Sequence, residues 1–536
     1  MTELDENPAG YQGQDEAATA DDRSLVSRKR FLATGLAAAG GLALAARDPI
    51  SAARAAEALA PKKRGGTLVV GSIGSTTDSL DPNLTQSNMD LQRLFNLYDT
   101  LTYFPHNALD LKYGLAESIE MTHGSTVATV RLRKGVEFHN GKTLSAEDLI
   151  YTWHHILEKS DPHASLLSMV DPTRLKKLDN RTVRAHLKHA DSVFPERFYV
   201  DQMVIIPKGF DPKHPVGTGP FKFKSFEPGK RSVFVRNPNY WIHGQPYIDE
   251  LVIIDMADPT AQINALLSGQ VDAIDSVPLN ETQVIKSRSN LRLLTAHGGY
   301  FQPIVMRVDK PPFNDVRVRQ AFRLIVDRPQ MITQAYDGYA VIGNDMPSPS
   351  DPAYPHLPQR RQDIAQAKSL LKAAGHSNLS VQLSTANEDF GLIPGAEVFV
   401  QNAKAAGVNV TLNQLQPSVF DAKFTVWPFT QGYWGNKPFG IMYSLLYFPG
   451  GIFNETHFND PQGNKIFTEA LKDSNPATRN AKFKELEKIL YERGGHIIHS
   501  FRTTVDAYNT KFKGFSADKA TGWSLGQYRY REVSLR

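Results

Sequence analysis

The stretch Val216–Asp272 constrains the fold of this 536-residue chain more than any other part, because strand and helix signals follow one another closely in it. A tight turn is predicted at Pro228 and Gly229, since proline pre-sets φ at the second turn position and glycine accepts the positive φ at the third. Strands are expected on both sides of this turn. Asp258 then has the position of a helix N-cap, and Gly269 that of the residue closing the same helix. Strands and helices that alternate in this way are typical of an α/β protein.

The same alternation continues before and after this stretch, and no repeat of fixed period is found. Ser145, with Asp148 three residues on, predicts another capped helix. Asn475 predicts the start of a helix that runs to Arg493. The pair Gly298–Gly299 predicts a break before an apolar strand. The length is sufficient for two or three domains of class α/β.

Residues 1–55 have the features of an export signal rather than of a folded domain. The run Ser27–Leu32 reads Ser-Arg-Lys-Arg-Phe-Leu and resembles the twin-arginine export motif, with Lys29 where a second arginine is usual. The apolar run that follows, Phe31–Ala46, is too short and too mild for a membrane span, which needs about 20 apolar residues. Ala53-Arg54-Ala55 fits a small-x-small cleavage site. We therefore predict export, with cleavage near Ala55.

The composition excludes several classes of partner and compartment. The chain is 41% hydrophobic and 22% charged with a net charge of +4, and its basic residues form no stripe interleaved with aromatics, so nucleic-acid binding is not expected. It contains no cysteine, which excludes disulfides, thiolate metal sites and a lipid-modified N-terminal cysteine. No other stretch predicts stable membrane insertion. An exported chain without a tether indicates a periplasmic protein.

The motifs of catalysis and metal binding are missing. Gly141–Thr143 reads Gly-Lys-Thr but lacks the glycine that a phosphate-binding loop needs five residues before its Gly-Lys, and it is interpreted as a turn. His496 and His499 lie in a strand-like run, where a spacing of three places them on opposite faces. Asp272 and Asp275 are interpreted as surface residues at a strand edge. We expect neither an enzyme nor a metal site nor another cofactor.

Several separate pieces of the chain, in the same order, resemble one known family. They are Leu115–Ser118, Leu132–Lys142, Gly217–Phe221, Asn237–Trp241 and Asn314–Phe322. Together they are similar to family 5 of the bacterial extracellular solute-binding proteins, which serve oligopeptide-, dipeptide- and nickel-type ABC transporters. The resemblance covers nearly all of the chain after the export signal.

This resemblance implies a two-lobed periplasmic-binding-protein type II fold with a hinged cleft and an extra domain inserted in lobe one. The expected boundaries are 65–102, 214–303 and 505–536 for lobe one, 103–213 for the insert and 304–504 for lobe two. The implied function is to capture a peptide-like or other small polar solute between the lobes and to present it to the permease and ATPase subunits of an importer. A periplasmic monomer is expected. An exported enzyme or a sensor domain on the same fold is the alternative.

The resemblance also places the ligand near the aromatic loop Trp427–Pro438. Peptide-binding members have a Trp-x-x-Asp pattern there, whereas this chain has Asn436 and Lys437 and no acidic residue between Thr425 and Phe453. We therefore expect a neutral or acidic solute that stacks on Trp434 or Tyr433. The alternative interpretation is that the aromatic side chains of this loop, Trp427 and Phe429 above all, belong to the core of the lobe.

Four further residues are candidates for ligand binding. Ser75 and Thr76 follow the first strand, at the carboxyl edge where α/β sheets bind ligands. The alternative for them is a plain loop before a helix capped by Asp81. Tyr354 lies in a proline-rich loop that resembles a pocket wall of peptide binders, and Tyr300 lies in the expected hinge strand.

Overall fold

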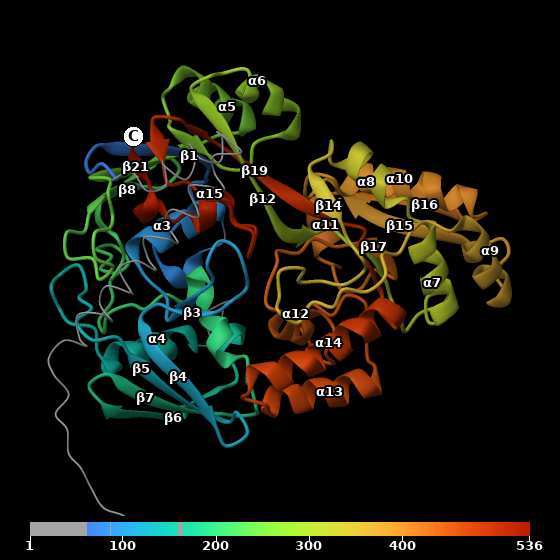
Figure 1. Cartoon of the computed structure of the whole chain (residues 1–536), viewed down its shortest axis with the longest axis horizontal. Coiled ribbons are helices and arrows are strands. Elements are labelled where there is room, and N and C mark those ends of the chain that lie inside the picture. Colours follow the sequence, from blue (N-terminus) through green and yellow to red (C-terminus); the bar gives the residue numbers. More distant parts are fainter. Residues whose placement is uncertain (1–61, 86, 159–163) are drawn as a thin grey trace, which may run out of the picture. The chain divides into compact units, whose positions relative to one another are not determined.

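The computed structural model describes residues 62–85, 87–158 and 164–536. The predicted export signal, its twin-arginine-like motif and its cleavage site lie outside the described residues. Residues 63–536 form one unit, in which three larger sheets organise the chain (Figure 1).

The largest sheet has eight strands and brings together the beginning, the middle and the end of the chain. Its order is β12 (Leu291–Phe301), β19 (Ser500–Asn509), β11 (Ala273–Ile274), β1 (Thr67–Ile73), β10 (Glu250–Met256), β9 (Arg231–Arg236) and β8 (Phe221–Glu227), and β14 (Ala340–Ile342) pairs with β19. The strands β1, β10 and β11 run parallel. The helices α3 (Asn88–Leu97) and α5 (Pro259–Ser268) contact β1.

The five-stranded sheet has the order β16 (Asn409–Leu415), β15 (Ser380–Ala386), β17 (Phe429–Gln431), β13 (Ile304–Met306) and β18 (His496–Ile497). Phe429 lies in its core with the rings of Phe313, Phe322 and Phe399, as the alternative interpretation of the aromatic loop expects. The helices in the same part of the chain are α7 (Val316–Ile325), α8 (Arg328–Ala335), α9 (Ile364–Ala373), α10 (Leu392–Ala405), α11 (Pro417–Asp421), α12 (Phe439–Leu446), α13 (Pro461–Lys472) and α14 (Pro476–Arg493).

The third sheet lies between β1 and β8 in the chain. It has the order β4 (Ala116–Thr122), β5 (Val127–Leu132), β7 (Thr182–Leu187) and β6 (Val170–Asp179), and α4 (Ala146–Ile156) packs on it. Trp153 of α4 stacks on Phe198 and meets Phe194 edge-on in its core. The described residues also form two short ribbons, β2 (Thr102–Tyr103) with β3 (Lys112–Tyr113), and β20 (Phe512–Lys513) with β21 (Ser534–Leu535).

The local predictions for Val216–Asp272 are confirmed. Gly229 has a φ of 73° in the turn between β8 and β9. The Asp258 side chain accepts a hydrogen bond from the amide of Ala261 at the start of α5, and Gly269 ends that helix with a φ of 79°. These features depend on neighbours in sequence only, which is why composition and spacing predict them.

The interpretation of Asp272 and Asp275 as surface residues is wrong. Their exposed fractions are 4% and 3%. They flank β11, a strand of two residues that lies between β1 and β19 in the middle of the large sheet rather than at its edge. Asp275 accepts hydrogen bonds from Ser72 and Gln262, and its burial raises its pKa.

The eight-stranded and five-stranded sheets are joined by continuous chain at two places. β12 leads through residues 302–303 into β13, and β18 leads through residues 498–499 into β19 (Figure 1). The pairing of β12 with β19 shifts register between Ala296 and Tyr300, where Gly299 has a φ of 79°. The expected break at Gly298–Gly299 is therefore present as a bulge in the strand that connects the sheets.

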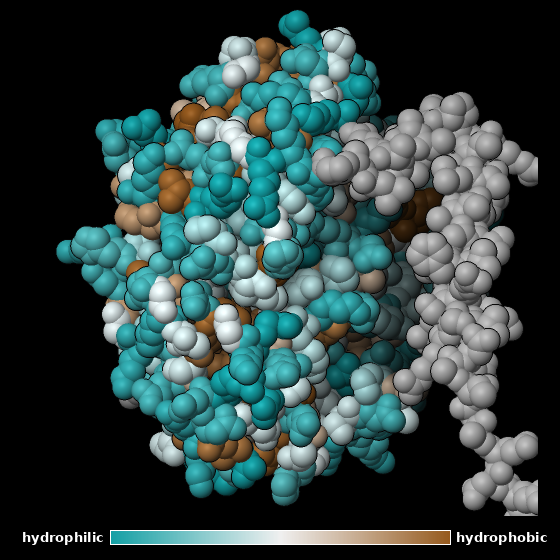
Figure 2. Space-filling view, turned by 60° about the vertical axis from the view of Figure 1, so that its left-hand side comes forward, coloured by the Kyte–Doolittle hydropathy of each residue, from teal (hydrophilic) through white to brown (hydrophobic). Residues whose placement is uncertain are grey.

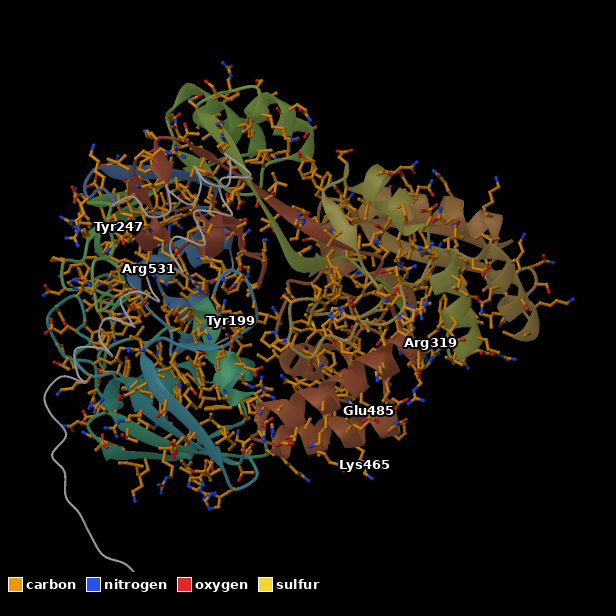
Figure 3. The ribbon with its side chains drawn as sticks, viewed as in Figure 1. Tyr199, Tyr247, Arg319, Lys465, Glu485 and Arg531 are labelled. Atoms are coloured by element: carbon orange, nitrogen blue, oxygen red, sulfur yellow. The ribbon has the colours of Figure 1, made fainter. Side chains whose placement is uncertain are left out.

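Two arginines of α7 bind the C-terminal end of α14. Arg323 is fully buried and donates to the carbonyl oxygens of Leu490, Tyr491, Gly494 and His496 at 2.7–3.1 Å. Arg319, labelled in Figure 3, donates to the carbonyl of Arg493 at 2.7 Å. Burial lowers the pKa of Arg323 to about 9. The orphan carbonyls of a helix end are thus satisfied by side chains from another helix.

Candidate functional site

Three parallel strands of the five-stranded sheet end at one edge and define a candidate binding site. β15 runs parallel to both β16 and β17. The segments that follow them are therefore neighbours: residues 387–391 after β15, 416–424 after β16 and 432–436 after β17. In α/β sheets, ligands bind outside the carboxyl ends of parallel strands. We call these three segments the edge loops.

The edge loops bring carboxylates next to Tyr433. The Tyr433 hydroxyl donates to Asp421 Oδ1 at 3.0 Å, and its ring lies 5.6 Å from that of Phe424. Burial raises the pKa of Glu388, and the nearby carboxylates of Asp421 and Asp389 raise it further. The edge loops therefore combine aromatic side chains with negative charge.

Tyr300 joins these loops to the connecting strands. Its hydroxyl donates to Asp389, and Gln302 donates to the same carboxylate at 2.9 Å. Arg502 of β19 donates to Asp389 Oδ1 at 2.8 Å, and its guanidinium lies 4.4 Å from the centre of the Tyr300 ring. Burial, followed by the Asp389 charge, raises the pKa of Tyr300 well above its usual value. One carboxylate of an edge loop thus holds both strands that connect the sheets.

Trp434 lies inside this region rather than on its surface. Its side chain is 9% exposed, and its Nε1 donates to Glu455 Oε1 at 2.8 Å. Its backbone pairs with that of Phe301 in both directions, at 2.9 and 3.0 Å. Its ring contacts those of Phe424 and Phe453. The indole therefore presents little face to a solute in this state, and the half-buried Tyr433 presents more.

Asn436 and Lys437 contact other loops. The buried Asn436 amide donates to Ser350 Oγ at 2.7 Å and to the carbonyl of Ala520, and the Lys437 carbonyl accepts from Ser348. Tyr354, in the same proline-rich loop as Ser348 and Ser350, is half-buried, and its pKa is raised by burial and then by Glu487. Asn436 thus ties an edge loop to the C-terminal segment of the chain.

Ser75 and Thr76 lie at the carboxyl end of β1, as expected, and are exposed. Ser75 Oγ accepts from the amide of Thr77, and Thr76 packs against the turn at Gly229. The cap at Asp81 is confirmed, because its side chain accepts from the amide of Asn83. These contacts of Ser75 and Thr76 are with their own loop and with the β8–β9 turn, so the structure brings together Tyr300, Tyr433 and Trp434 but not these two.

Four residues of this region were not predicted from the sequence: Asp389, Asp421, Glu455 and Arg502. The window between Thr425 and Phe453 contains no acidic residue, yet Asp421 and Glu455 contact Tyr433 and Trp434 from just outside it. Asp389 comes from a different loop. No motif marks these residues, and a search limited to one loop cannot find them. The expectation of a neutral or acidic solute used only the acid-free loop, whereas in the folded chain carboxylates from outside it contact Tyr433 and Trp434.

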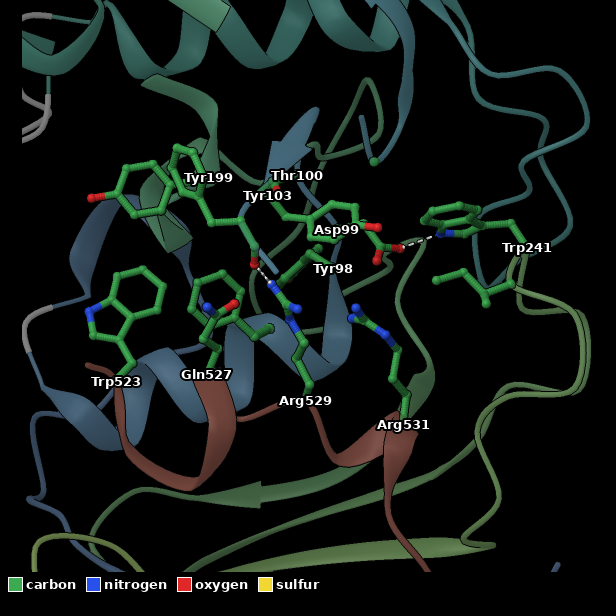
Figure 4. A pocket seen from close by; sticks show the side chains of 14 residues that line it. Tyr98, Asp99, Thr100, Tyr103, Tyr199, Trp241, Trp523, Gln527, Arg529 and Arg531 are labelled. Atoms are coloured by element: carbon green, nitrogen blue, oxygen red, sulfur yellow. Dashed lines mark hydrogen bonds between the residues drawn. The ribbon is translucent and has the colours of Figure 1, made fainter. Parts of the chain in front are cut away.

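A small cavity of about 40 Å³ lies where the chain after α3 meets the C-terminal segment (Figure 4). On one side Asp99 accepts hydrogen bonds from Thr218 at 3.0 Å and from Tyr240 and Trp241 at 2.9 Å. Burial raises the pKa of Asp99. Asp99 thereby links the motifs at Gly217–Phe221 and Asn237–Trp241, which explains them as scaffold.

A groove of about 630 Å³ lies between β4, residues 192–196 and the N-terminal half of α14. Across it Arg479 of α14 donates to Glu196 Oε1 at 2.6 Å and to the carbonyl of Ser192 at 2.8 Å. Burial raises the pKa of Glu196 to about 7 although Arg479 opposes this shift. The segment that follows β7 is therefore in contact with α14 through a carboxyl group whose pKa is raised to about 7.

The substitution Glu196→Gln is expected to weaken the pH dependence of stability. The folded chain holds this proton up to about pH 7, whereas the unfolded chain releases it near the ordinary value of 4.5. The contribution of this group is therefore fully present below that ordinary value and is lost as the pH rises to about 7. Urea midpoints at about pH 5 and about pH 7 should differ less in Glu196→Gln than in the wild type. Glu120→Gln, exposed on the same groove, is the control; a pH dependence unchanged in Glu196→Gln would contradict the assignment.

Metal binding and membrane insertion find no support in the described residues. Within residues 62–85, 87–158 and 164–536, no group of three or more His, Cys, Asp or Glu side chains is placed to hold a metal ion. In the same residues no helix is long and apolar enough to cross a membrane. The face in Figure 2 is mainly hydrophilic with scattered apolar residues.

The chain has two lobes, each built on a sheet, and two segments join them. A candidate site lies at the strand ends beside these segments. This arrangement is that of a hinged solute-binding protein. Residues 110–452 match the family described as bacterial extracellular solute-binding proteins, family 5. The match covers more than half of the chain, and the chain belongs to this family. The predicted family and two-lobed type II fold are confirmed.

Named relatives agree with this assignment. The oligopeptide-binding protein AppA of Bacillus subtilis (strain 168) is 30% identical over 334 residues, which are 58% of this chain and 60% of AppA. The glutathione-binding protein GsiB of Pectobacterium atrosepticum is 24% identical over 90% of this chain and 95% of GsiB. The structure of HbpA2 from Haemophilus parasuis has a TM-score of 0.76 at 21% identity and covers 88% of this chain and all of that one (100%). Both curated relatives are named as binding proteins.

Proposed function

We propose that this chain is the substrate-binding component of an ABC importer, which captures a peptide-like or other small polar solute and delivers it to the membrane permease. The observation that carries the proposal is the convergence of the edge loops on the strands that connect the lobes, through Asp389, Tyr300 and Arg502. A solute bound there contacts the hinge directly. It can therefore shift the open and closed populations by its different affinity for the two states.

The named relatives support a peptide-like solute, since one is named for oligopeptides and the other for glutathione. The site offers aromatic surface at Tyr433 and Tyr300 and carboxylates at Asp421 and Glu388. Carboxylates pair with ammonium groups, and aromatic rings pack on apolar side chains. In our proposal Trp434, Asn436, Lys437 and Tyr354 complete the wall of the site, and Ser75 and Thr76 face the solute from the other lobe.

We also propose the domain boundaries, the cellular location and the partners of the protein. Lobe one would comprise residues 65–102, 214–303 and 505–536, the insert residues 103–213 and lobe two residues 304–504. The protein would be an exported periplasmic monomer, with an export signal that ends near Ala55. Its partners would be the permease and ATPase subunits of the importer.

The substitution Tyr433→Ala is expected to reduce affinity for the solute by about ten-fold, or 1.4 kcal/mol, because it removes a half-exposed aromatic contact. The solute is first identified by native mass spectrometry of the protein purified from its host. Its binding to the stripped protein is then measured by calorimetry. Leu178→Ala, at an exposed position of β6, is the control and should bind as the wild type does. Equal affinity of Tyr433→Ala and the wild type would remove Tyr433 from the site, and recovery of no small solute would contradict the proposed function.

A further inference from the structure

The cavity beside Asp99 receives two arginine side chains from the C-terminal segment. Figure 4 shows the guanidinium groups of Arg529 and Arg531 directed into it, below Tyr103 and Asp99. Arg529 donates to the carbonyl of Phe104, and its guanidinium lies 4.9 Å from the centre of the Tyr103 ring. Two like charges thus share one largely enclosed space.

Arg531 has compensating charges nearby but few hydrogen bonds: burial lowers its pKa, and the surrounding Tyr240, Glu532 and Asp99 outweigh this and raise it. Its side chain is 13% exposed, and the nearest carboxylate oxygen, Glu532 Oε1, lies 3.7 Å away, beyond hydrogen-bond distance. Its Nε is buried without a partner. In the described part of the chain no hydrogen-bond acceptor is recorded for the other nitrogens of its guanidinium either. A buried charged group without hydrogen bonds is costly, so a missing acceptor is expected next to it.

The carboxylates already present supply countercharge, since the charge of Arg531 lowers the pKa of both Asp99 and Glu532, but their hydrogen bonds shown here are with other groups. Asp99 accepts from the neutral donors Thr218, Tyr240 and Trp241. Glu532 accepts from or pairs with His106 at 3.2 Å. Burial lowers the pKa of Arg529 to about 10, and the charge of Arg531 adds to this effect. The guanidinium of Arg531 therefore retains hydrogen-bond donors for a further acceptor.

The size and the lining of the cavity restrict that anion. A volume of about 40 Å³ corresponds to about three water-sized groups, and a carboxylate has three non-hydrogen atoms. Trp523 and Tyr199, whose rings are stacked at 5.7 Å, form an aromatic wall. Trp523 is three residues after Ala520, whose carbonyl accepts a hydrogen bond from Asn436 of an edge loop. The cavity is therefore close in the chain to the region where the C-terminal segment meets the candidate site.

We propose that Arg531 and Arg529 bind a carboxylate group in this cavity, with any adjoining apolar part of the molecule against Trp523 and Tyr199. The carboxylate belongs either to the acidic end of the transported solute or to a free carboxylate ion. Only the first of these sources rests on the proposed function. Arg531 donates two hydrogen bonds to the group in the planar arrangement that guanidinium and carboxylate share.

The test uses the full chain, stripped of solute, with acetate and acetamide as probes at constant ionic strength. Acetate is expected to raise Tm saturably, because a ligand that binds only the folded state stabilises it, whereas acetamide is expected to have no such effect. Arg531→Gln should weaken acetate binding at least about ten-fold. Arg288→Gln, at an exposed position in the segment before β12, is the control and should bind acetate as the wild type does. Equal shifts with acetate and acetamide, or unchanged acetate affinity in Arg531→Gln, would overturn the proposal.

A second measurement distinguishes the two sources and does not depend on the folding of one variant. The solute identified from the host is titrated into the wild type, Arg531→Gln and Arg531→Lys. Parallel losses of acetate and solute affinity, smaller in Arg531→Lys, assign the site to the solute. Loss of acetate affinity alone assigns it to a free carboxylate ion. If no solute is recovered but the affinity for acetate still depends on Arg531, the carboxylate site is supported and the proposed function is contradicted.

Discussion

Gly298→Ala is expected to destabilise the protein by about 3 kcal/mol or more. A Cβ at this position would lie 1.9 Å from the Cα and 2.3 Å from the nitrogen of Gly522, and 2.8 Å from the carbonyl oxygen of Asp518. All three atoms belong to the backbone, so no side chain can turn aside to relieve the overlap. The free energy of unfolding from urea denaturation is the measurement.

The chain offers a matched control for this substitution. Gly435 has no heavy atom within 4 Å of an added Cβ, so Gly435→Ala should change stability by less than about 1 kcal/mol. If Gly298→Ala is as stable as Gly435→Ala, the close crossing of β12 with the C-terminal segment is not a feature of the folded protein in solution. If Gly298→Ala is destabilised relative to Gly435→Ala, the close crossing restricts which side chains β12 tolerates at this position.

Arg323→Met is expected to cost about 3 kcal/mol. The carbonyl of Leu490 would keep its bond from the amide of Gly494, and that of Tyr491 its bond from Arg360. The carbonyls of Gly494 and His496 would lose the guanidinium donors. Each buried acceptor left unsatisfied costs about 1–3 kcal/mol, which exceeds what is recovered by no longer burying the charge.

Thermal and urea unfolding of Arg323→Met and Arg317→Met, side by side, test this expectation. Arg317 lies on the same helix, but its side chain is 48% exposed and its ion pair is with the neighbouring Asp315. An exposed pair of this kind contributes about 0–1 kcal/mol. Comparable losses in both variants would show that helix α7, rather than the cap on α14, is what the substitutions disturb.

The features that the sequence predicted correctly are those encoded by near neighbours. Ser145 and Asp148 form the expected capping box, and Asp258 with Gly269 bounds its helix as expected. The position of β11 could not be predicted in this way. Its two residues pair with strands that come from both ends of the chain, so the burial of Asp272 and Asp275 depends on contacts that no local pattern encodes.

The residues of the candidate site also divide into those predicted from local sequence and those that only the folded chain brings together. Tyr300 and Tyr433 were found because one lies in an expected strand and the other in an aromatic loop. Asp389 and Arg502, which are 113 positions apart, meet only in the folded chain. The sequence-based expectation of an uncharged or acidic solute used Lys437 and one acid-free loop, and it did not include the carboxylates that other loops bring to Tyr433 and Trp434. The proposal of a carboxylate-bearing solute has a separate basis, which is the pair of arginines beside Asp99.

The large sheet also has a consequence for the order of folding. β1 lies close to the start of the described chain, yet the same sheet is completed by β19 near its end, and Lys63 forms a bridge with Leu535. Contacts between such distant positions close long loops and form slowly. The sheet that includes β1 is therefore completed only when β19 is available. Until then β12, β14 and one edge of β11 lack their partner strand, although β1, β8, β9 and β10 can already pair.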